Sequence, residues 1–243
     1  MVNTEDTVTF KELNWDTEFF GVTSAQLILH RSVTLDEWKI LKTKLKNYQF
    51  VSIVNVNSEP VNAQLVGKNT TAFLVDVNIQ FEKKLGCLDL WKVPENITIN
   101  QAMERNDQII EVANFCFSKF TEDPELARRG GDQVYSHWLI NSFGKLDKYY
   151  AISRNPTGDI NGFVLFSYST NTCVIELIAV SQKEIKRGIG SSLFKAVEIA
   201  AYQKDSNRIK VGTQIRNTAA INFYQSVGCK QVACNQVYHL WNL

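Results

Sequence analysis

The chain has 243 residues, of which 44% are apolar, so it can bury a substantial core as one large domain or two small ones. Lys and Arg total 26 against 25 Asp and Glu, and a net charge of +1 excludes a global attraction to nucleic acid or to an anionic membrane. No run of about 18 apolar residues occurs, and no cationic start precedes an apolar stretch at the N-terminus, so we expect a soluble, cytoplasmic protein.

Cysteine and histidine usage points to a reduced protein without a bound metal. The five cysteines form no C-x-x-C pair, and their odd number argues against a disulfide framework. The three histidines lie far apart in the sequence, so we expect no metal site.

The first 85 residues carry the signals of a small α/β unit. Thr34 and Glu37 form a capping box, which predicts the start of a helix. From Phe73 onward apolar and polar residues alternate, as in a half-buried antiparallel strand. The expected elements are two strand pieces within residues 10–29 joined by a polar, aromatic-rich turn at 14–21, a helix from 34 to 47, and strands at 50–56 and 73–82.

A stretch with one Pro and several turn-forming residues, 93–101, is the best candidate for a domain boundary. We therefore place a smaller N-terminal α/β domain at residues 1–95 and a second domain at 96–243.

The second domain is expected to be a mixed α/β sheet flanked by helices. Hairpin spacing from Tyr149 to Val180 predicts three antiparallel strands. The other expected elements are helices at 107–120 and 134–143, a loop or short helix at 121–132, a helix ending near 203, a strand at 209–213, a helix at 217–226 and a strand at 236–241.

A glycine loop follows the buried apolar strand at 174–180 and opens a helix. Gly188 and Gly190 lack a Cβ, so backbone N–H groups can converge on an anion, and the first helical turn adds partial positive charge. Lys186 and Arg187 precede the glycines. The loop is consistent with a phosphate site and also with a tight turn.

Two further groups of residues allow two interpretations each. The first group consists of the aromatic residues Trp15, Phe19 and Phe20. It forms either a hydrophobic contact that closes the edge of the domain or a platform for a flat ligand ring. Arg128 and Arg129 either hold a substrate phosphate or belong to a solvated helix end.

Two motifs in the second half resemble those of the GCN5-related N-acetyltransferase (GNAT) superfamily. In that family a Q/R-x-x-G-x-G/A loop holds the pyrophosphate of acetyl-CoA, and the similar loop here departs from the pattern at its first position. A second signature, N-x-x-A-x-x-x-Y-x-x-x-G, is also present and falls on an expected helix. The matching positions are residues 185–190, with Ile185 in place of Gln or Arg, and Asn217, Ala220, Tyr224 and Gly228.

The resemblance implies a GNAT fold, acetyl-CoA as acetyl donor and direct attack by an amine. It makes Tyr224 the general acid for the departing thiolate, with a core tyrosine as the other interpretation. Glu176 is a base, a water relay or a structural residue. The cofactor-binding residues that it implies are Ile178, Ala179, Val180, Ile185, Lys186, Arg187, Gly188, Ile189, Gly190, Ser191, Asn217, Ala220 and Tyr224.

A narrower similarity covers most of the chain. The segments LNWDTEFFG, YSHWLINSF and VGTQIRNTAAINFYQSVG look like those of the dTDP-fucosamine acetyltransferase group, which serves bacterial surface polysaccharide (lipopolysaccharide) synthesis. This implies a dTDP-4-amino-4,6-dideoxyhexose as acceptor and a homodimer. It also implies that the domain at 1–95 lies on the acceptor side and that the domain at 96–243 is the acetyl-CoA-binding catalytic domain. The alternatives are a protein N-terminus, polyamine or antibiotic as acceptor, or a non-catalytic acetyl-CoA sensor. The implied substrate contacts are Trp15, Phe19, Phe20, Arg128, Arg129 and Tyr135.

Overall fold

The computed structural model describes residues 8–86, 92–101, 103–113, 118–185 and 187–243. The strands are β1 Val8–Glu12, β2 Ser24–Leu29, β3 Phe50–Asn55, β4 Phe73–Lys84, β5 Ile97–Gln101, β6 Lys148–Arg154, β7 Ile160–Ser169, β8 Thr172–Val180, β9 Arg208–Gln214 and β10 Lys230–Trp241. The helices are α1 Asn14–Phe20, α2 Leu35–Leu45, α3 Pro60–Asn69, α4 Asp107–Val112, α5 Lys119–Glu122, α6 Pro124–Arg128, α7 Val134–Ser142, α8 Ile189–Gln203 and α9 Thr218–Ser226.

All the described strands join one ten-stranded sheet in the order β1-β2-β3-β10-β4-β9-β8-β7-β6-β5. Its pairs are antiparallel except β2–β3 and β8–β9. The predicted class, a mixed and mostly antiparallel sheet flanked by helices, is confirmed, as are the three antiparallel strands β6, β7 and β8.

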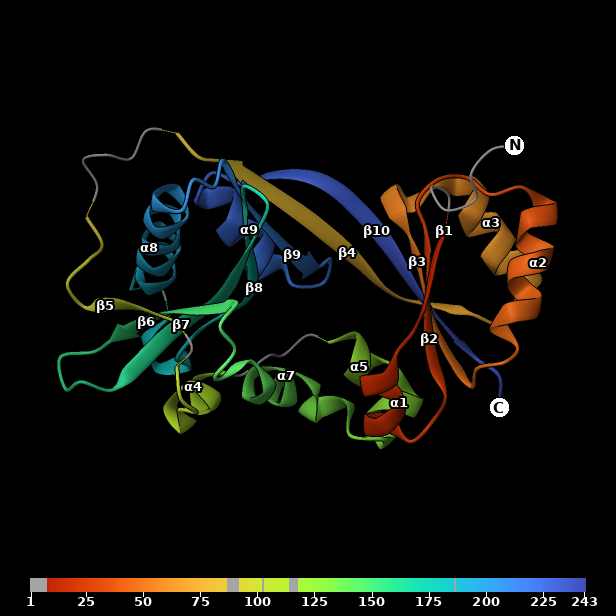
Figure 1. Ribbon diagram of the computed structural model, residues 1–243, viewed down its shortest axis with the longest axis horizontal. Coiled ribbons are helices and arrows are strands. Elements are labelled where there is room, and N and C mark those ends of the chain that lie inside the picture. Colours follow the sequence, from red (N-terminus) through yellow and green to blue (C-terminus); the bar gives the residue numbers. More distant parts are fainter. Residues whose placement is uncertain (1–7, 87–91, 102, 114–117, 186) are drawn as a thin grey trace.

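The long strands β4 and β10 run from one half of the molecule to the other (Figure 1). β4 lies between β9 and β10, so a strand from the N-terminal part is paired on both edges with C-terminal strands. The division at residues 95 and 96 stays a prediction.

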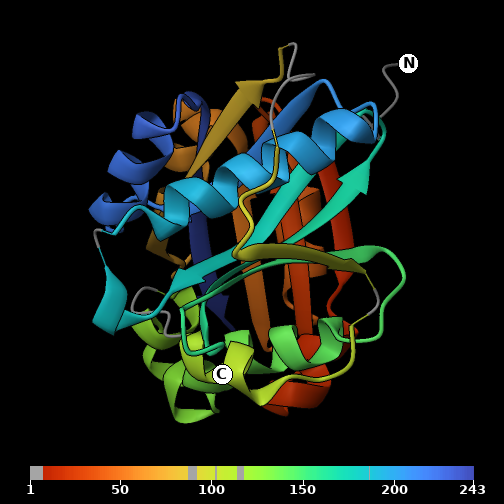
Figure 2. The ribbon, with the colours of Figure 1, turned by 90° about the vertical axis from the view of Figure 1, so that its left-hand side faces the viewer.

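The C-terminal half of the sheet is covered on both faces. α8 lies across the strands (Figure 2) and packs against β5 to β9. Its apolar residues recur at helical spacing, so one face of the helix is buried in the core. On the other face α4 and α7 enclose a second core with β6, β7 and β8. A row of short helices, α4, α7, α5 and α1, runs along that side of the molecule (Figure 1).

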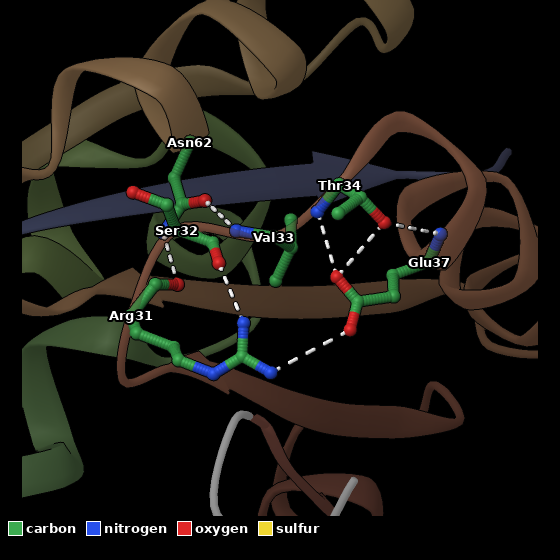
Figure 3. A network of polar contacts seen from close by, with 6 residues as sticks. All are labelled: Arg31, Ser32, Val33, Thr34, Glu37 and Asn62. Atoms are coloured by element: carbon green, nitrogen blue, oxygen red, sulfur yellow. Dashed lines mark hydrogen bonds and ion pairs between the residues drawn. The ribbon is translucent and has the colours of Figure 1, made fainter. Parts of the chain in front are cut away.

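The N-terminal half buries Trp38 and Leu45 of α2 against β2, β3 and β10. The capping box predicted at Thr34 and Glu37 is confirmed. A buried amide fixes the chain just before it: Asn62 of α3 accepts a hydrogen bond from the Val33 N–H at 3.0 Å and donates one to the Arg31 carbonyl at 3.0 Å (Figure 3). These bonds set where α2 begins.

Some predicted elements were wrong or missing. The stretch 14–21 is not a turn but helix α1, which ends at Gly21 in the left-handed conformation with its N–H bonded to the Thr17 carbonyl. Helix α3, with Pro60 at its first position, and strand β5, inside the expected boundary, were not predicted. The expected single helix at 107–120 is wrong: α4 ends at a non-helical Ala113, and α5 begins after Ser118, which has an extended backbone and caps it. Residues 114–117 lie outside the described residues.

Replacing Gly131 by Ala is expected to destabilise the protein by about 2 kcal/mol, through overpacking. Gly131 is buried between α6 and α7, and a Cβ there would overlap the backbone carbonyl oxygen of Phe120 and lie 2.9 Å from that of Leu126. The control is Gly67→Ala inside α3, where a Cβ meets open space and Ala should stabilise by about 0.5–1 kcal/mol. Urea unfolding measures both variants, and equal effects would contradict the packing described for Gly131.

Candidate active site

The central strand β8 has two irregularities that open a site. Leu177 pairs with Leu165 of β7 while Ile175 pairs with Phe166, so Glu176 is the extra residue of a β-bulge. On its other edge β8 pairs with β9 only from Thr172 to Ile175. Beyond that point the two strands separate, which leaves the backbone groups on this edge of β8 free to bind a ligand.

A cleft of about 960 Å³ occupies this gap and continues between the sheet and the helices α5 and α7. It is large enough for the reacting parts of two substrates. Its described lining includes Val54, Asp76, Asn78, Lys119, Phe120, Tyr135, Trp138, Lys148, Glu176, Ile178, Ala179, Val180, Thr213, Gln214, Asn217, Ala220, Tyr224, Asn235 and Val237.

Tyr224 reaches the cleft from α9 and is 3% exposed. Its ring packs against Phe81 and Phe223, with ring centroids 5.6 and 5.4 Å away. Burial raises its pKa well above the ordinary value of tyrosine, and the nearby Cys229 thiol adds to the increase. The hydroxyl is therefore protonated at neutral pH, as a proton donor must be.

Glu176 also lines the cleft, but its carboxylate is already engaged. Oε1 accepts hydrogen bonds from Lys148 Nζ at 2.6 Å and from Ser167 Oγ at 2.5 Å. The side chains of Glu176 and Lys148 are both largely buried, so this is a shielded ion pair that spans β7, from β8 to β6. Lys148 and Ser167 were not predicted as site residues.

Asn217 is the N-cap of α9, where its Oδ1 accepts a hydrogen bond from the Ala220 N–H at 3.1 Å. Both residues line the cleft, with Ala220 about one turn and Asn217 about two turns before Tyr224. The cap occupies the oxygen of the Asn217 amide. That Asn217 binds the pantetheine arm stays a prediction, for which its amide nitrogen would be the group.

The glycine loop lies at the start of α8, outside the lining of the cleft. Gly188 has a φ of +79°, a conformation that favours glycine, and a Cβ on Gly190 would approach Phe223 to 3.2 Å. No side chain caps this helix, so the N–H groups of its first turn can bind an anion. Ile185 is 50% exposed, and Arg187 lies 3.7 Å from Glu184. The predicted contact Lys186 lies outside the described residues.

The predicted substrate contacts are spread over α1, α6 and α7. Trp15 and Phe19 stack at 4.7 Å near His137 of α7, whereas Phe20 is buried in the core. None of these three aromatic residues lines the cleft.

The two predicted arginines, too, do not line the cleft. Arg128 is exposed and paired with Glu125, and Arg129 donates a hydrogen bond to the Phe20 carbonyl at 3.1 Å. Tyr135 is the predicted substrate residue that does line the cleft, and its hydroxyl accepts a hydrogen bond from Gln214 at 3.0 Å.

The end of the cleft beside β4 and α5 contains charged residues that the sequence analysis missed. Asp76 of β4 and Lys119 of α5 both line it. Asp16 of α1 acts electrostatically on Lys119 from outside the cleft. The available signal for Asp76 was its place among the polar residues that alternate with apolar ones in β4.

The described cysteines provide no activated nucleophile at this site. Burial raises the pKa of Cys173 to about 12 and that of Cys229 to about 11. Cys234 lies on β10, with its sulfur 3.6 Å from the Ser58 hydroxyl. Cys87 and Cys116 lie outside the described residues.

Within the described residues no group of three or more His, Cys, Asp or Glu side chains is arranged to hold a metal ion. Among the helices described, none is both long and apolar enough to cross a membrane.

Two curated relatives have names that refer to sugar chemistry, one to dTDP-fucosamine and one to polysaccharide biosynthesis. The chain is 26% identical to dTDP-fucosamine acetyltransferase of Escherichia coli O6:H1, over 89% of this chain and 91% of the relative. It is 25% identical to the spore coat polysaccharide biosynthesis protein SpsD of Bacillus subtilis, over 56% of this chain. That match covers 47% of SpsD, so the chain spans about half of this relative's length.

Solved structures share the fold. A GCN5-related N-acetyltransferase from Sphaerobacter thermophilus matches with a TM-score of 0.62 and 14% identity, over 97% of this chain and 77% of that chain. A conserved protein of unknown function from Staphylococcus epidermidis matches with a TM-score of 0.65 and 12% identity, over 100% and 94%.

The sequence of residues 106–229, just over half of the chain, matches the acetyltransferase (GNAT) family. This segment contains the separation of β8 from β9, the glycine loop and Tyr224. The chain therefore belongs to the acetyltransferase (GNAT) family.

Proposed function

We propose that the protein transfers the acetyl group of acetyl-CoA to the amine of a nucleotide-linked amino-deoxy sugar, of the dTDP-4-amino-4,6-dideoxyhexose type. The observation that carries this proposal is the continuity of the cleft. One end opens where β8 and β9 separate, beside Tyr224, and the other lies among polar and aromatic residues of β4, α5 and α7.

The donor end fits acetyl-CoA. The free edge of β8 at Ile178 and Val180 offers backbone groups to the pantetheine arm and to the acetyl carbonyl. The loop at Gly188 and the start of α8 would hold the pyrophosphate through backbone N–H groups. Because that contact is made by the backbone, Ile185 can replace the family's Gln or Arg.

The acceptor end fits a sugar that carries a flat base. Polar groups that can bind the hydroxyls and amine of the sugar come from Asp76, Asn78 and Gln214. Aromatic surface for the base comes from Tyr135 and Trp138. Trp138 is 41% exposed and its ring stacks on Tyr135 at 6.2 Å. Mixed polar and aromatic walls of this kind are typical of sites for sugar nucleotides, and the relationship to a dTDP-fucosamine acetyltransferase supports the same class.

Different groups of the cleft then carry out the separate steps of acetyl transfer. Tyr224 gives its proton to the sulfur as the thioester bond breaks, and backbone N–H groups of β8 stabilise the charge on the carbonyl oxygen. Acetyl-CoA supplies the activated acetyl group. The raised pKa values of Cys173 and Cys229 favour direct attack by the amine over an acetylated cysteine.

A panel of acceptors tests the proposal. Purified protein with acetyl-CoA should acetylate dTDP-4-amino-4,6-dideoxyhexoses much faster than peptides, polyamines or aminoglycosides, measured as CoA release and as N-acetylated product by mass spectrometry. Activity on peptides alone would overturn the acceptor class. Binding of acetyl-CoA without acetylation of any amine would indicate a sensor and overturn the enzymatic role.

A further inference from the structure

Asp76 has an unusual position for a carboxylate. It lies on β4 opposite Val237 of β10, and the residue after β9, Ile215, donates its N–H to the Val77 carbonyl at 2.9 Å. This places Asp76 beside the segment that leads into α9 and Tyr224. Its side chain lines the same cleft.

Asp76 differs from Glu176, the other carboxylate in the cleft. One oxygen of the Glu176 carboxylate accepts hydrogen bonds from both Lys148 and Ser167. Asp76 forms no direct ion pair with any residue that the structure describes; Lys119 of α5 acts on it from a longer distance. A partly buried carboxylate without a bound cation is less stable as the anion unless a ligand completes the site.

We propose that Asp76 is the group that binds the acceptor's ammonium and removes its proton, and that Lys119 is a positioning residue that keeps Asp76 ionised. The inference rests on the proposed function, because it needs an amine acceptor in this cleft. It also moves the base from the bulge of β8 to β4, outside the segment 106–229 that matches the family.

The surroundings of Asp76 suit this role. Burial raises its pKa to about 6, opposed by the nearby backbone N–H groups of Val77 and Ile215 and by the charge of Lys119. Glu122 of α5 raises it further, although Arg216 pairs with Glu122 at 2.9 Å.

Tyr135 of α7 is a further titratable neighbour and faces Asp76. Lys119 in turn interacts electrostatically with Asp16 of α1, Lys11 of β1 and His239 of β10. Burial also raises the pKa of Tyr135, so its hydroxyl carries no charge near neutral pH. A base with a pKa near 6 is ionised at pH 7 and still accepts a proton.

Protons and bonds balance with these groups. Asp76 takes one proton from R–NH₃⁺, and the amine nitrogen then attacks the carbonyl carbon of the acetyl thioester. The C–N bond forms, the C–S bond breaks, and Tyr224 protonates the thiolate. The nitrogen loses its second proton, which restores Tyr224, and Asp76 releases the first proton to solvent.

The test is the pH profile of kcat/KM for the acceptor, in wild type and in Asp76→Asn. Wild type should lose activity below about pH 6, where Asp76 becomes protonated. Asp76→Asn should lose about 100-fold or more at pH 7, as expected for a general base. Its activity should recover as pH approaches the pKa of the acceptor amine, because free amine then forms without a base. Asp76→Glu should keep part of the activity.

Further variants separate this role from a structural one. Asp205→Asn, an exposed control, should behave as wild type. Lys119→Met should move the acidic limb to higher pH, because the loss of a positive charge raises the pKa of Asp76. KM for acetyl-CoA should stay unchanged in Asp76→Asn, which shows that the variant is folded.

Two results would overturn the inference in distinguishable ways. If Asp76→Asn keeps the wild-type rate and profile while Glu176→Gln loses the acidic limb, Glu176 is the base and the proposed function stands. If wild type acetylates none of the amines, the proposed function fails and the role of Asp76 fails with it.

Discussion

Tyr224→Phe should lower kcat by about 100-fold or more while KM for acetyl-CoA changes little, as expected when a general acid is removed. The ring keeps its contacts with Phe81 and Phe223, so the change removes only the proton donor. Steady-state rates of CoA release measure both parameters.

The matched control is Tyr168→Phe. Tyr168 is a partly buried tyrosine on β7 whose ring packs against Tyr149 and Phe166, and it does not line the cleft. It should keep nearly full activity. Equal loss in both variants, or no loss in Tyr224→Phe, would exclude Tyr224 as the donor.

Asp123→Ala should destabilise the fold by about 3–5 kcal/mol, because buried donors lose their partner. Asp123 is fully buried, and its Oδ1 caps α6 at the N–H groups of Glu125 and Leu126. Oδ2 accepts hydrogen bonds from His239 Nδ1 at 2.6 Å and from Trp241 Nε1 at 2.9 Å. This carboxylate joins the row of short helices to β10.

The pKa shifts in this cluster agree with that role. Burial alone would raise the pKa of Asp123, but the hydrogen bonds from His239 and Trp241 outweigh it and lower the value. Burial lowers the pKa of His239, so its ring is neutral at pH 7 and donates from Nδ1. Asp123→Ala therefore leaves two donors and a helix start without a partner.

Urea unfolding of Asp123→Ala and of the exposed control Asp132→Ala gives the comparison. The control should lie within about 0.5 kcal/mol of wild type, as for most surface substitutions. A loss in Asp123→Ala of less than about 1 kcal/mol would contradict the account of this cluster.

The elements whose sequence signal is local were predicted well. The capping box at Thr34 fixed the start of α2, and hairpin spacing gave β6, β7 and β8. Asn217 and Tyr224 were found because their spacing on one helix is a local pattern, and both line the cleft.

The parts that were missed depend on contacts between distant segments. Lys148 forms an ion pair with Glu176 across β7, and no local sequence pattern near either residue predicts this pair. Asp76 had the alternation of an ordinary half-buried strand, and only its place between β9 and β10 shows that its polar face lines a cleft. Helix α1 was taken for a turn because its aromatic residues pack against distant α5 and α7.

The central claim is that donor and acceptor occupy one cleft together and that the amine attacks the thioester directly. Initial rates measured over a grid of acetyl-CoA and amino sugar concentrations test it. The account predicts double-reciprocal lines that intersect, as for a ternary complex, and no acetylated protein by mass spectrometry when acetyl-CoA is added alone. Parallel lines with a stable acetyl-enzyme would contradict it.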